Sequence, residues 1–330
     1  MKKLLKRICS AFLAAATVFC FTGCGKGVVK DGSKIEKMNI VFEYTDTDDK
    51  AQTLNVEIEL YMNYAPATIA HVKYLASKGY YDGTVVSDLK QNHIELGEFY
   101  LDNGERKSRY DENAKFAYTS IINSDYVSGK TIANGKRNRY TATGSIVGEF
   151  RANGISSSKT LTVSDGTLVL KRDTLSYDVD GGHDTAKGTL ALVTGSDGYY
   201  TNVESGYTAA QCFAVIGKIT KGKDTLKKLI TDADKYVKDT NGSTTYYFDY
   251  ENCVDGSDEK SKAVYEQFES LGHVFVKDSE GKYTAVGGET PIDVTGEDYS
   301  DVLSTLNSNS KYLRAVPYKT ITIKSVKVSK

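Results

Sequence analysis

Alternating apolar and polar positions predict the strands at both ends of the folded chain. The alternation is clearest in 54–61, where four apolar residues fall on one side, namely Leu54, Val56, Ile58 and Leu60. A period of two is typical of a half-buried antiparallel strand, and 37–44 is predicted to be its hairpin partner across a polar loop. The last strand is predicted at 318–328, where the alternation breaks near Lys324 and Ser325 as it does at a bulge.

Two stretches have helical spacing instead. Pro66 suits a first helical turn and Gly79 suits the end of a helix, which together predict a helix of about 12 residues. Apolar residues at helical spacing predict a second helix over 223–237. His71 lies in the middle of the first helix, where a surface or packing histidine is favoured over a metal ligand.

Short apolar runs predict the remaining strands, at 145–150, 161–163, 168–170, 174–179, 188–193 and 212–219. Asp165 and Gly166 suit a hairpin turn. Polar insertions are expected at about 100–142, 155–182 and 238–312, the first with one short strand and the last with helices at 264–271 and 299–306. A closed barrel is the natural way to bury so many short strands, so the predicted fold is mainly β, a β-barrel with α.

The N-terminus has the pattern of a secretory signal. A basic stretch precedes the apolar run 8–21, whose 14 residues are too few to span a bilayer. The run ends in Phe-Thr-Gly-Cys24, which resembles the bacterial lipobox, although ordinary cleavage beside an incidental cysteine is the alternative. We therefore expect 1–23 to be a lipoprotein signal peptide, and 24–37 to be the lipidated Cys24 followed by a flexible tether.

Charge changes the expected partners. The whole chain has a formal net charge of -1, but removal of 1–23 takes away four positive charges and no negative ones. The mature chain is therefore acidic, which argues against nucleic acid as a partner because phosphate binding needs a basic surface. Membrane attachment is expected through lipid on Cys24, at the extracytoplasmic face of a bacterial cell membrane.

Cysteines and histidines do not form a metal motif in the sequence. Once Cys24 is assigned to lipid, Cys212 and Cys253 remain in the mature chain, and a disulfide between them is possible outside the cytoplasm. The apolar surroundings of Cys212 favour a small buried side chain instead. The four histidines are scattered, and neither CxxC nor HExxH occurs, so no metal and no cofactor are expected.

Four sequence blocks, taken in their order along the chain, are more informative than the general pattern of strands and helices. They are 56–84 (VEIELYMNYAPATIAHVKYLASKGYYDGT), 148–154 (GEFRANG), 217–229 (GKITKGKDTLKKL) and the strand after Pro317. Together they resemble the cyclophilin-type peptidyl-prolyl isomerases. The resemblance implies one domain over 38–330, with a closed eight-stranded antiparallel barrel, two capping helices and a groove for proline-containing peptides. It implies no cofactor.

The segment that follows the first block departs from the family. Where the family has a sequence like TFHRVIPGFMIQGGD, this chain has VVSDLKQNHIELGEF. Asp88 stands at the catalytic Arg, His93 at a groove Phe and Leu96 at the Gln. Loss of one preorganised donor typically costs about 3 kcal/mol of transition-state stabilisation, so the resemblance implies weak activity at best.

Other residues are candidates for the groove. Ala-Gln211-Cys-Phe213 resembles the SQFF of the family and would put Gln211 and Phe213 there, but the match is compressed. These residues equally suit the following strand at 212–219. Lys90, Arg106 or Arg109 would be alternative donors, although exposed surface charge is the favoured interpretation.

Three functions remain open at this point. The first is a membrane-anchored isomerase that assists folding of secreted proteins, with proline-containing polypeptides as partners. The second is a catalytically silent lipoprotein of the same fold, which binds peptides or an extracytoplasmic protein through its groove or through insertions rich in its 24 tyrosines. A solute-binding lipoprotein is the third, but the chain lacks the two βαβ domains such proteins need.

Overall fold

A computed structural model describes most of the barrel region and parts of the insertions. The described residues are 36–123, 140–141, 144–172, 183–196, 200, 203–204, 207–208, 211–232, 235–236, 238, 244–248, 274–277, 283–286 and 313–329. The predicted signal peptide, the strand at 174–179, the helices at 264–271 and 299–306, and Cys253 lie outside them. The predicted tether lies outside them up to residue 35, and its last two residues belong to the first strand.

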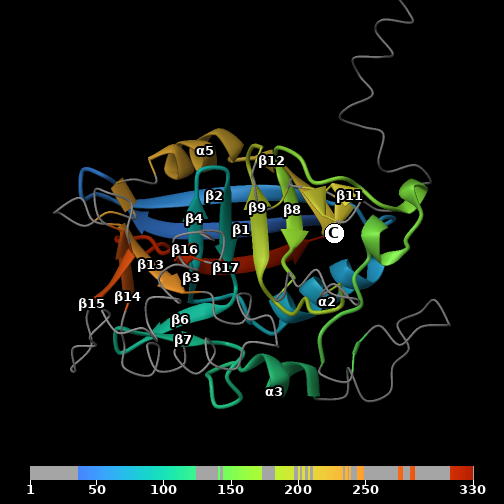
Figure 1. Cartoon of the computed structure of the whole chain (residues 1–330), viewed down its shortest axis with the longest axis horizontal. Helices are drawn as coiled ribbons and strands as arrows, with labels where there is room; N and C mark the ends of the chain where they lie inside the picture. The colour runs from blue at the N-terminus through green and yellow to red at the C-terminus, as the bar shows by residue number, and fades with distance from the viewer. Residues whose placement is uncertain are drawn as a thin grey trace, which may run out of the picture.

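Within the described residues, eleven antiparallel strands form the main sheet, in the order β4-β5-β9-β8-β12-β2-β1-β17-β3-β6-β7. Their bounds are β1 Glu36–Thr45, β2 Ala51–Leu60, β3 Thr84–Val85, β4 Asp88–Lys90, β5 His93–Leu96, β6 Phe99–Asp102, β7 Glu105–Ser108, β8 Thr167–Leu170, β9 Leu190–Val193, β12 Ala214–Lys221 and β17 Thr322–Ser329. The sheet curls around its core as a half-barrel (Figure 1). The mainly β fold is thus confirmed, but eleven strands in an open order stand where a closed eight-stranded barrel is predicted.

The long strands form as the alternation predicts. Ile40 pairs with Val56 in the β1–β2 hairpin, so the apolar faces of both strands point the same way. In the β1–β17 pair, Val41 faces Ser325 while Phe42 faces Ile323. Lys324 is therefore the extra residue of a β-bulge, at the position where the alternation in the sequence breaks.

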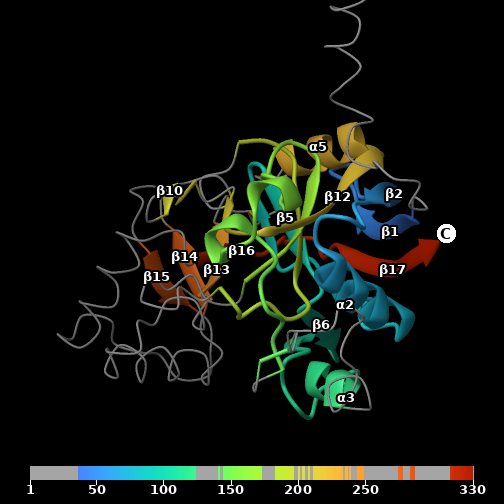
Figure 2. The same ribbon diagram turned by 90° about the vertical axis from the view of Figure 1, so that its right-hand side faces the viewer.

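Two helices cover the core. The helix α2 (Pro66–Ser77) and the helix α5 (Lys223–Thr231) lie on opposite sides of β1, β2 and β17 (Figures 1 and 2). The apolar faces of both belong to one buried cluster, to which α2 contributes Val72 and α5 contributes Leu226. After α2, Gly79 has a φ of 69°, a left-handed conformation that glycine adopts without strain.

The start of α2 is capped from a distant segment. Its first turn holds no acidic residue, but Glu149 Oε2 accepts hydrogen bonds from the backbone N–H of Thr68 at 2.7 Å and from its hydroxyl at 2.9 Å. A carboxylate there accepts a hydrogen bond from a backbone N–H that has no partner within the helix, and it interacts favourably with the helix dipole. Such a cap typically stabilises a protein by about 1 kcal/mol. The Gly-Glu-Phe block thus has a structural role. Its predicted strand at 145–150 is reduced to isolated bridges at Ile146.

The first insertion is more ordered than one short strand. It contains the β6–β7 hairpin and a helix α3 (Tyr118–Asn123). The hairpin turns at Asn103 and Gly104, whose φ values are 53° and 88°. Asn-Gly is the preferred pair for a tight hairpin turn because both residues tolerate positive φ, so this dipeptide is the signal that predicts the hairpin. In the second insertion, 168–170 forms β8, whereas 161–163 forms no strand.

Smaller sheets lie outside the half-barrel. The third insertion and the strand directly after it form a four-stranded sheet in the order β15-β14-β13-β16, with β13 Thr244–Phe248, β14 Val274–Lys277, β15 Tyr283–Val286 and β16 Leu313–Ala315. It lies at the end of the molecule opposite the end of β17 (Figures 1 and 2). The strands β10 (Val203–Glu204) and β11 (Tyr207–Thr208) pair with each other. Among the described helices, none is long and apolar enough to cross a bilayer.

A second apolar cluster covers the outer face of β8, β9 and β12. It consists of Val163, Val169, Ala191, Val193, Tyr200, Cys212, Phe213 and Val215. The strand β8 lies between β9 and β12, although it precedes both in the sequence. This part of the sheet is therefore buried on both faces, and the outer cover borders directly on the β4–β5 hairpin.

Candidate functional site

The β4–β5 hairpin contains Asp88, His93 and Leu96, the positions at which the sequence departs from the cyclophilin pattern. Asp88 pairs with Glu95 and Lys90 pairs with His93 across the hairpin. Directly opposed residues project to the same face of an antiparallel pair, and alternate residues share that face. These four side chains therefore lie together on the outer face of the sheet.

Leu96 is on the other face. It belongs to the main apolar core, together with Ile94 and Leu89. The resemblance to the cyclophilin family places Leu96 and Asp88 in one groove, but the register of the hairpin separates them. A shift of one residue in register moves a side chain to the opposite face, so alignment by spacing alone does not fix which residues meet.

Asp88 makes three polar contacts in this arrangement. Its Oδ1 accepts a hydrogen bond from the backbone N–H of Ala315 at 2.8 Å. Its Oδ2 lies 3.2 Å from His93 Nε2 and 3.2 Å from Lys90 Nζ. Because Ala315 is the last residue of β16, the carboxylate at the substituted catalytic position connects the four-stranded sheet to the half-barrel.

Glu95 extends the same network. Its Oε2 lies 2.8 Å from Lys171 Nζ, and its Oε1 accepts a hydrogen bond from the hydroxyl of Tyr200 at 2.6 Å. His93 Nε2 is 3.8 Å from Glu95 Oε1, so the imidazole lies between the two carboxylates. The sequence singles out neither Glu95 nor Lys171, and it indicates Tyr200 only as one of the tyrosines that could contact a partner. The signal in the sequence that could have indicated Glu95 and Lys171 is a charged residue within an apolar run. Charged residues are almost never fully buried unless they are paired, so each of them requires a partner.

Most of the network is buried, and only Lys90 reaches solvent, with 26% of its side chain exposed. The residues Asp88, His93, Glu95 and Lys171 are 3%, 1%, 1% and 3% exposed. Burial by itself would raise the pKa of Asp88, but Lys90, the hydrogen bond and charge of His93, and Lys171 together outweigh it. They hold the pKa of the Asp88 carboxyl well below its usual range, so this carboxylate is ionised at neutral pH.

The same three residues have the composition of a metal site. One ligand atom each of Asp88, His93 and Glu95 lie within 4.8 Å of one another. However, Lys90 and Lys171 already pair with the two carboxylates, and a divalent cation would have to displace both ammonium groups. Since each carboxylate already has a cationic partner, the donor set fits an ion-pair network better than a metal.

Gln211 and Phe213 lead into β12, which begins at Ala214. Phe213 is buried in the outer cluster, where its ring centroid is 4.8 Å from that of Tyr200, and Gln211 is half-buried. The structure therefore brings Phe213, but not Leu96, close to the network around His93. Cys212 is buried in the same cluster, in agreement with the prediction of a small apolar packing role, while its pairing with Cys253 stays untested.

The remaining basic candidates are not surface charges. Arg109 is 2% exposed and donates to the backbone carbonyls of Lys115 and, at 3.1 Å, Asp82. Arg106 stacks on the ring of Phe99 at 3.7 Å and donates to the carbonyl of Ser87 at 3.4 Å. The expectation of exposed charge is wrong for Arg109, because backbone carbonyls and aromatic rings replace water around its guanidinium.

His71 packs inside the fold, as predicted. Its Nδ1 is 2.8 Å from the hydroxyl of Tyr140 and its Nε2 is 2.6 Å from the carbonyl oxygen of Lys187. Burial lowers the pKa of His71 to about 4, with a smaller opposing effect from the Lys187 carbonyl. The neutral imidazole thus connects α2 to the segment before β9.

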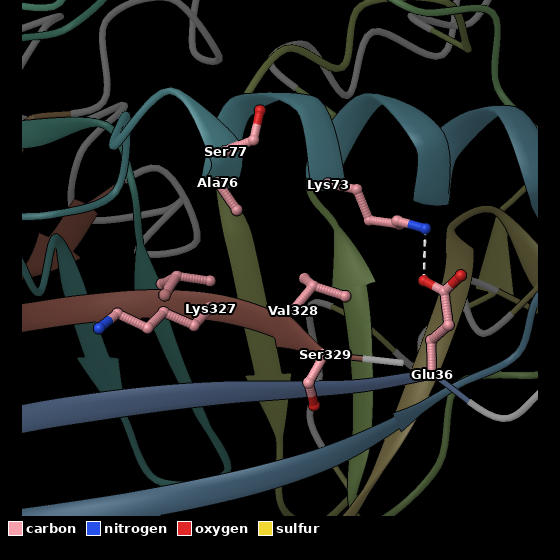
Figure 3. A pocket seen from close by; sticks show the side chains of 8 residues that line it. Glu36, Lys73, Ala76, Ser77, Lys327, Val328 and Ser329 are labelled. Carbon is pink, nitrogen blue, oxygen red and sulfur yellow. Dashed lines mark ion pairs between the residues drawn. The ribbon is translucent and has the colours of Figure 1, made fainter.

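A cavity of about 390 Å³ lies away from the network, between α2 and the end of β17 (Figure 3). Its walls include Ala76 and Ser77 of the helix, together with Val326 and Val328 of the strand. Lys73 and Glu36 form an ion pair at one end of it. Small apolar and hydroxyl side chains with an internally satisfied ion pair offer no catalytic group, so this cavity is not the candidate site.

Comparison with known proteins bears on the fold and not on the function. No family model matches the chain, and no curated protein matches it. Two of the solved structures that it resembles are of a cyclophilin. A cyclophilin-type peptidyl-prolyl cis-trans isomerase of Cryptosporidium parvum is 12% identical with a TM-score of 0.34, covering 63% of this chain and 88% of that one. A structure of that isomerase in the presence of the dipeptide Ala-Pro is 14% identical with a TM-score of 0.32, covering 62% and 88%. Likeness this weak carries no functional argument.

Proposed function

We propose that this protein is a lipid-anchored, extracytoplasmic cyclophilin-like protein that binds polypeptides without appreciable isomerase activity. The ordered sequence blocks that resemble cyclophilins support the fold assignment. The largely buried network around Asp88 is the observation that carries the proposal. Of the functions that the sequence leaves open, the silent binding protein is therefore favoured over the isomerase.

The physical reason is the nature of the reaction. Rotation about an X-Pro amide has a barrier of ~18–20 kcal/mol, which falls when a donor stabilises the twisted amide. At the position of the family's Arg, this chain has an anionic acceptor that is 3% exposed and already hydrogen-bonded to Ala315. A carboxylate cannot donate in its ionised form, and a buried one cannot contact a peptide.

A proline-peptide isomerisation assay tests this proposal. We expect the purified domain 38–330 to leave the rate of cis-trans exchange of a short Ala-Pro peptide at its uncatalysed value. Asp88→Arg alone is expected to raise the rate little, because His93 and Leu96 also depart from the family pattern. Exchange by NMR measures both, with an active cyclophilin as positive control. Saturable turnover by the wild-type domain would refute the silent role.

Anchoring is proposed from the sequence pattern that ends at Cys24. Acylation there would hold the described fold, which begins at Glu36, within a tether of 11 residues from the membrane, a reach of about 40 Å. We expect the full chain, expressed in a bacterium, to incorporate labelled palmitate and to fractionate with membranes, and Cys24→Ala to lose both. The variant Cys212→Ala is the matched control. Equal labelling of the Cys24→Ala variant would contradict the assignment.

A further inference from the structure

A phenolic side chain fills the space over the buried network. Tyr200 is fully buried, with its hydroxyl donating to Glu95 Oε1 at 2.6 Å. Its ring lies edge-on to His93, with the centroids 5.0 Å apart, and tilted against Phe213 at 4.8 Å. One side chain thus contacts a carboxylate, an imidazole and an aromatic wall at once.

The segment that carries Tyr200 is not a strand of the main sheet. It belongs to the excursion between β9 and β12, whose described strands β10 and β11 pair only with each other. Within the described part of the excursion, no β-ladder therefore holds Tyr200 against the half-barrel. The described contacts of Tyr200 with the half-barrel are made by its side chain, and a side chain of the same kind from another polypeptide could make equivalent ones.

The groups around Tyr200 match a phenol in both their polar and their apolar parts. Lys171 fixes the Glu95 carboxylate at 2.8 Å, so that its other oxygen is directed at the bound hydroxyl. A hydrogen bond to an ionised acceptor is stronger than one between neutral groups. The floor is apolar, from side chains of the outer cluster that include Val193 and Val215. A phenylalanyl ring would fit the walls but would leave the Glu95 oxygen without this donor, which is costly in a buried site.

We propose that this pocket is a tyrosyl-binding site which Tyr200 fills in cis, and that a partner polypeptide binds by inserting its own tyrosine in place of Tyr200. The inference rests on the binding role proposed above and specifies the chemistry of the partner. It requires that the emptied pocket distinguish tyrosine from phenylalanine through Glu95.

The test uses the full chain with Tyr200→Ala and two probes, N-acetyltyrosinamide and N-acetylphenylalaninamide. We expect the variant to bind the tyrosine amide at least about tenfold more tightly than the phenylalanine amide, as measured by calorimetry. Adding Glu95→Gln is expected to reduce this preference severalfold. Wild-type protein should bind the tyrosine amide more weakly than Tyr200→Ala, because the resident side chain has to leave first.

Three results would overturn the inference. They are a folded Tyr200→Ala variant that binds neither amide, one that binds both equally, and a wild-type chain with no tyrosine-dependent binding at millimolar probe. If Tyr200→Ala does not fold alone, recovery of its native circular dichroism in p-cresol but not in toluene supports the site, and failure to recover counts against it. Neither probe contains proline, so these results are independent of the isomerase assay.

Discussion

Replacement of Asp88 by alanine is expected to lower the free energy of unfolding by about 3–5 kcal/mol at pH 7. The substitution leaves Lys90 and His93 without their carboxylate and the N–H of Ala315 without its acceptor. Removing one partner from a buried network typically has a cost of this size, because the groups it paired stay buried without it. Here these groups are His93 and the N–H of Ala315, whereas Lys90 is 26% exposed and can turn to solvent. Urea unfolding followed by circular dichroism measures the change.

Two comparisons make this prediction specific to the network. Asp48→Ala removes an exposed carboxylate 3.8 Å from Lys50 and should change stability by less than about 0.5 kcal/mol. Asp88→Asn keeps an oxygen that can accept the hydrogen bond from the N–H of Ala315. It should therefore lower the free energy of unfolding by less than Asp88→Ala does. If Asp88→Ala and Asp48→Ala had equal effects, Asp88 would not be part of a buried ion-pair network.

The Asp88 prediction also has a definite pH dependence. The pKa of Asp88 is lowered in the folded state from an unfolded value of about 3.9. Its contribution is therefore fully present above that unfolded pKa and is lost as the pH falls toward the lower folded one. The stability difference between wild type and Asp88→Ala should accordingly narrow below about pH 5.

The second large effect is expected at Lys171. Lys171→Met removes the cation that pairs with Glu95 and should destabilise the fold by about 3–5 kcal/mol. The double variant Glu95→Leu with Lys171→Met removes both charges and should recover much of that loss. The hydroxyl of Tyr200 then lacks its acceptor, which leaves a residual loss of about 1–3 kcal/mol that Tyr200→Phe should relieve.

Non-additivity is the decisive feature of this series. Residues of one network couple, whereas distant sites add. Lys107→Met is the matched control, because its ion pair with Asp102 is exposed and screened by solvent, so that its loss should leave stability nearly unchanged. A double variant as unstable as the sum of its single substitutions would show that Glu95 and Lys171 act separately.

Much of the half-barrel can be predicted because its signals are local. The alternation in β1 and β2, the proline and glycine that bound α2, and the bulge at Lys324 each depend on residues close in sequence. The β6–β7 hairpin has an equally local signal in Asn103 and Gly104, which the polar composition of the insertion hides. The open order of eleven strands depends instead on long-range pairing, which no local pattern determines.

The candidate site is only partly predictable for a similar reason. The resemblance to cyclophilins selects Asp88 and His93, which do lie together, and Leu96, which points into the core. Glu95 contacts Lys171 and Tyr200 from 76 and 105 positions away, so sequence spacing does not bring these groups together. What the sequence does contain is a set of opposite charges within apolar runs, each of which needs a partner once buried.

Asp88 belongs to a largely buried ion-pair network, at the position where the resemblance to cyclophilins places a catalytic arginine. The most direct test is an NMR titration of the Asp88 side-chain carbon in selectively labelled protein, assigned with Asp88→Asn. We expect no protonation of this carboxylate between pH 7 and about pH 3 while the chain stays folded. A midpoint near 3.9 or higher, as for a solvated or unpaired carboxylate, would contradict the account.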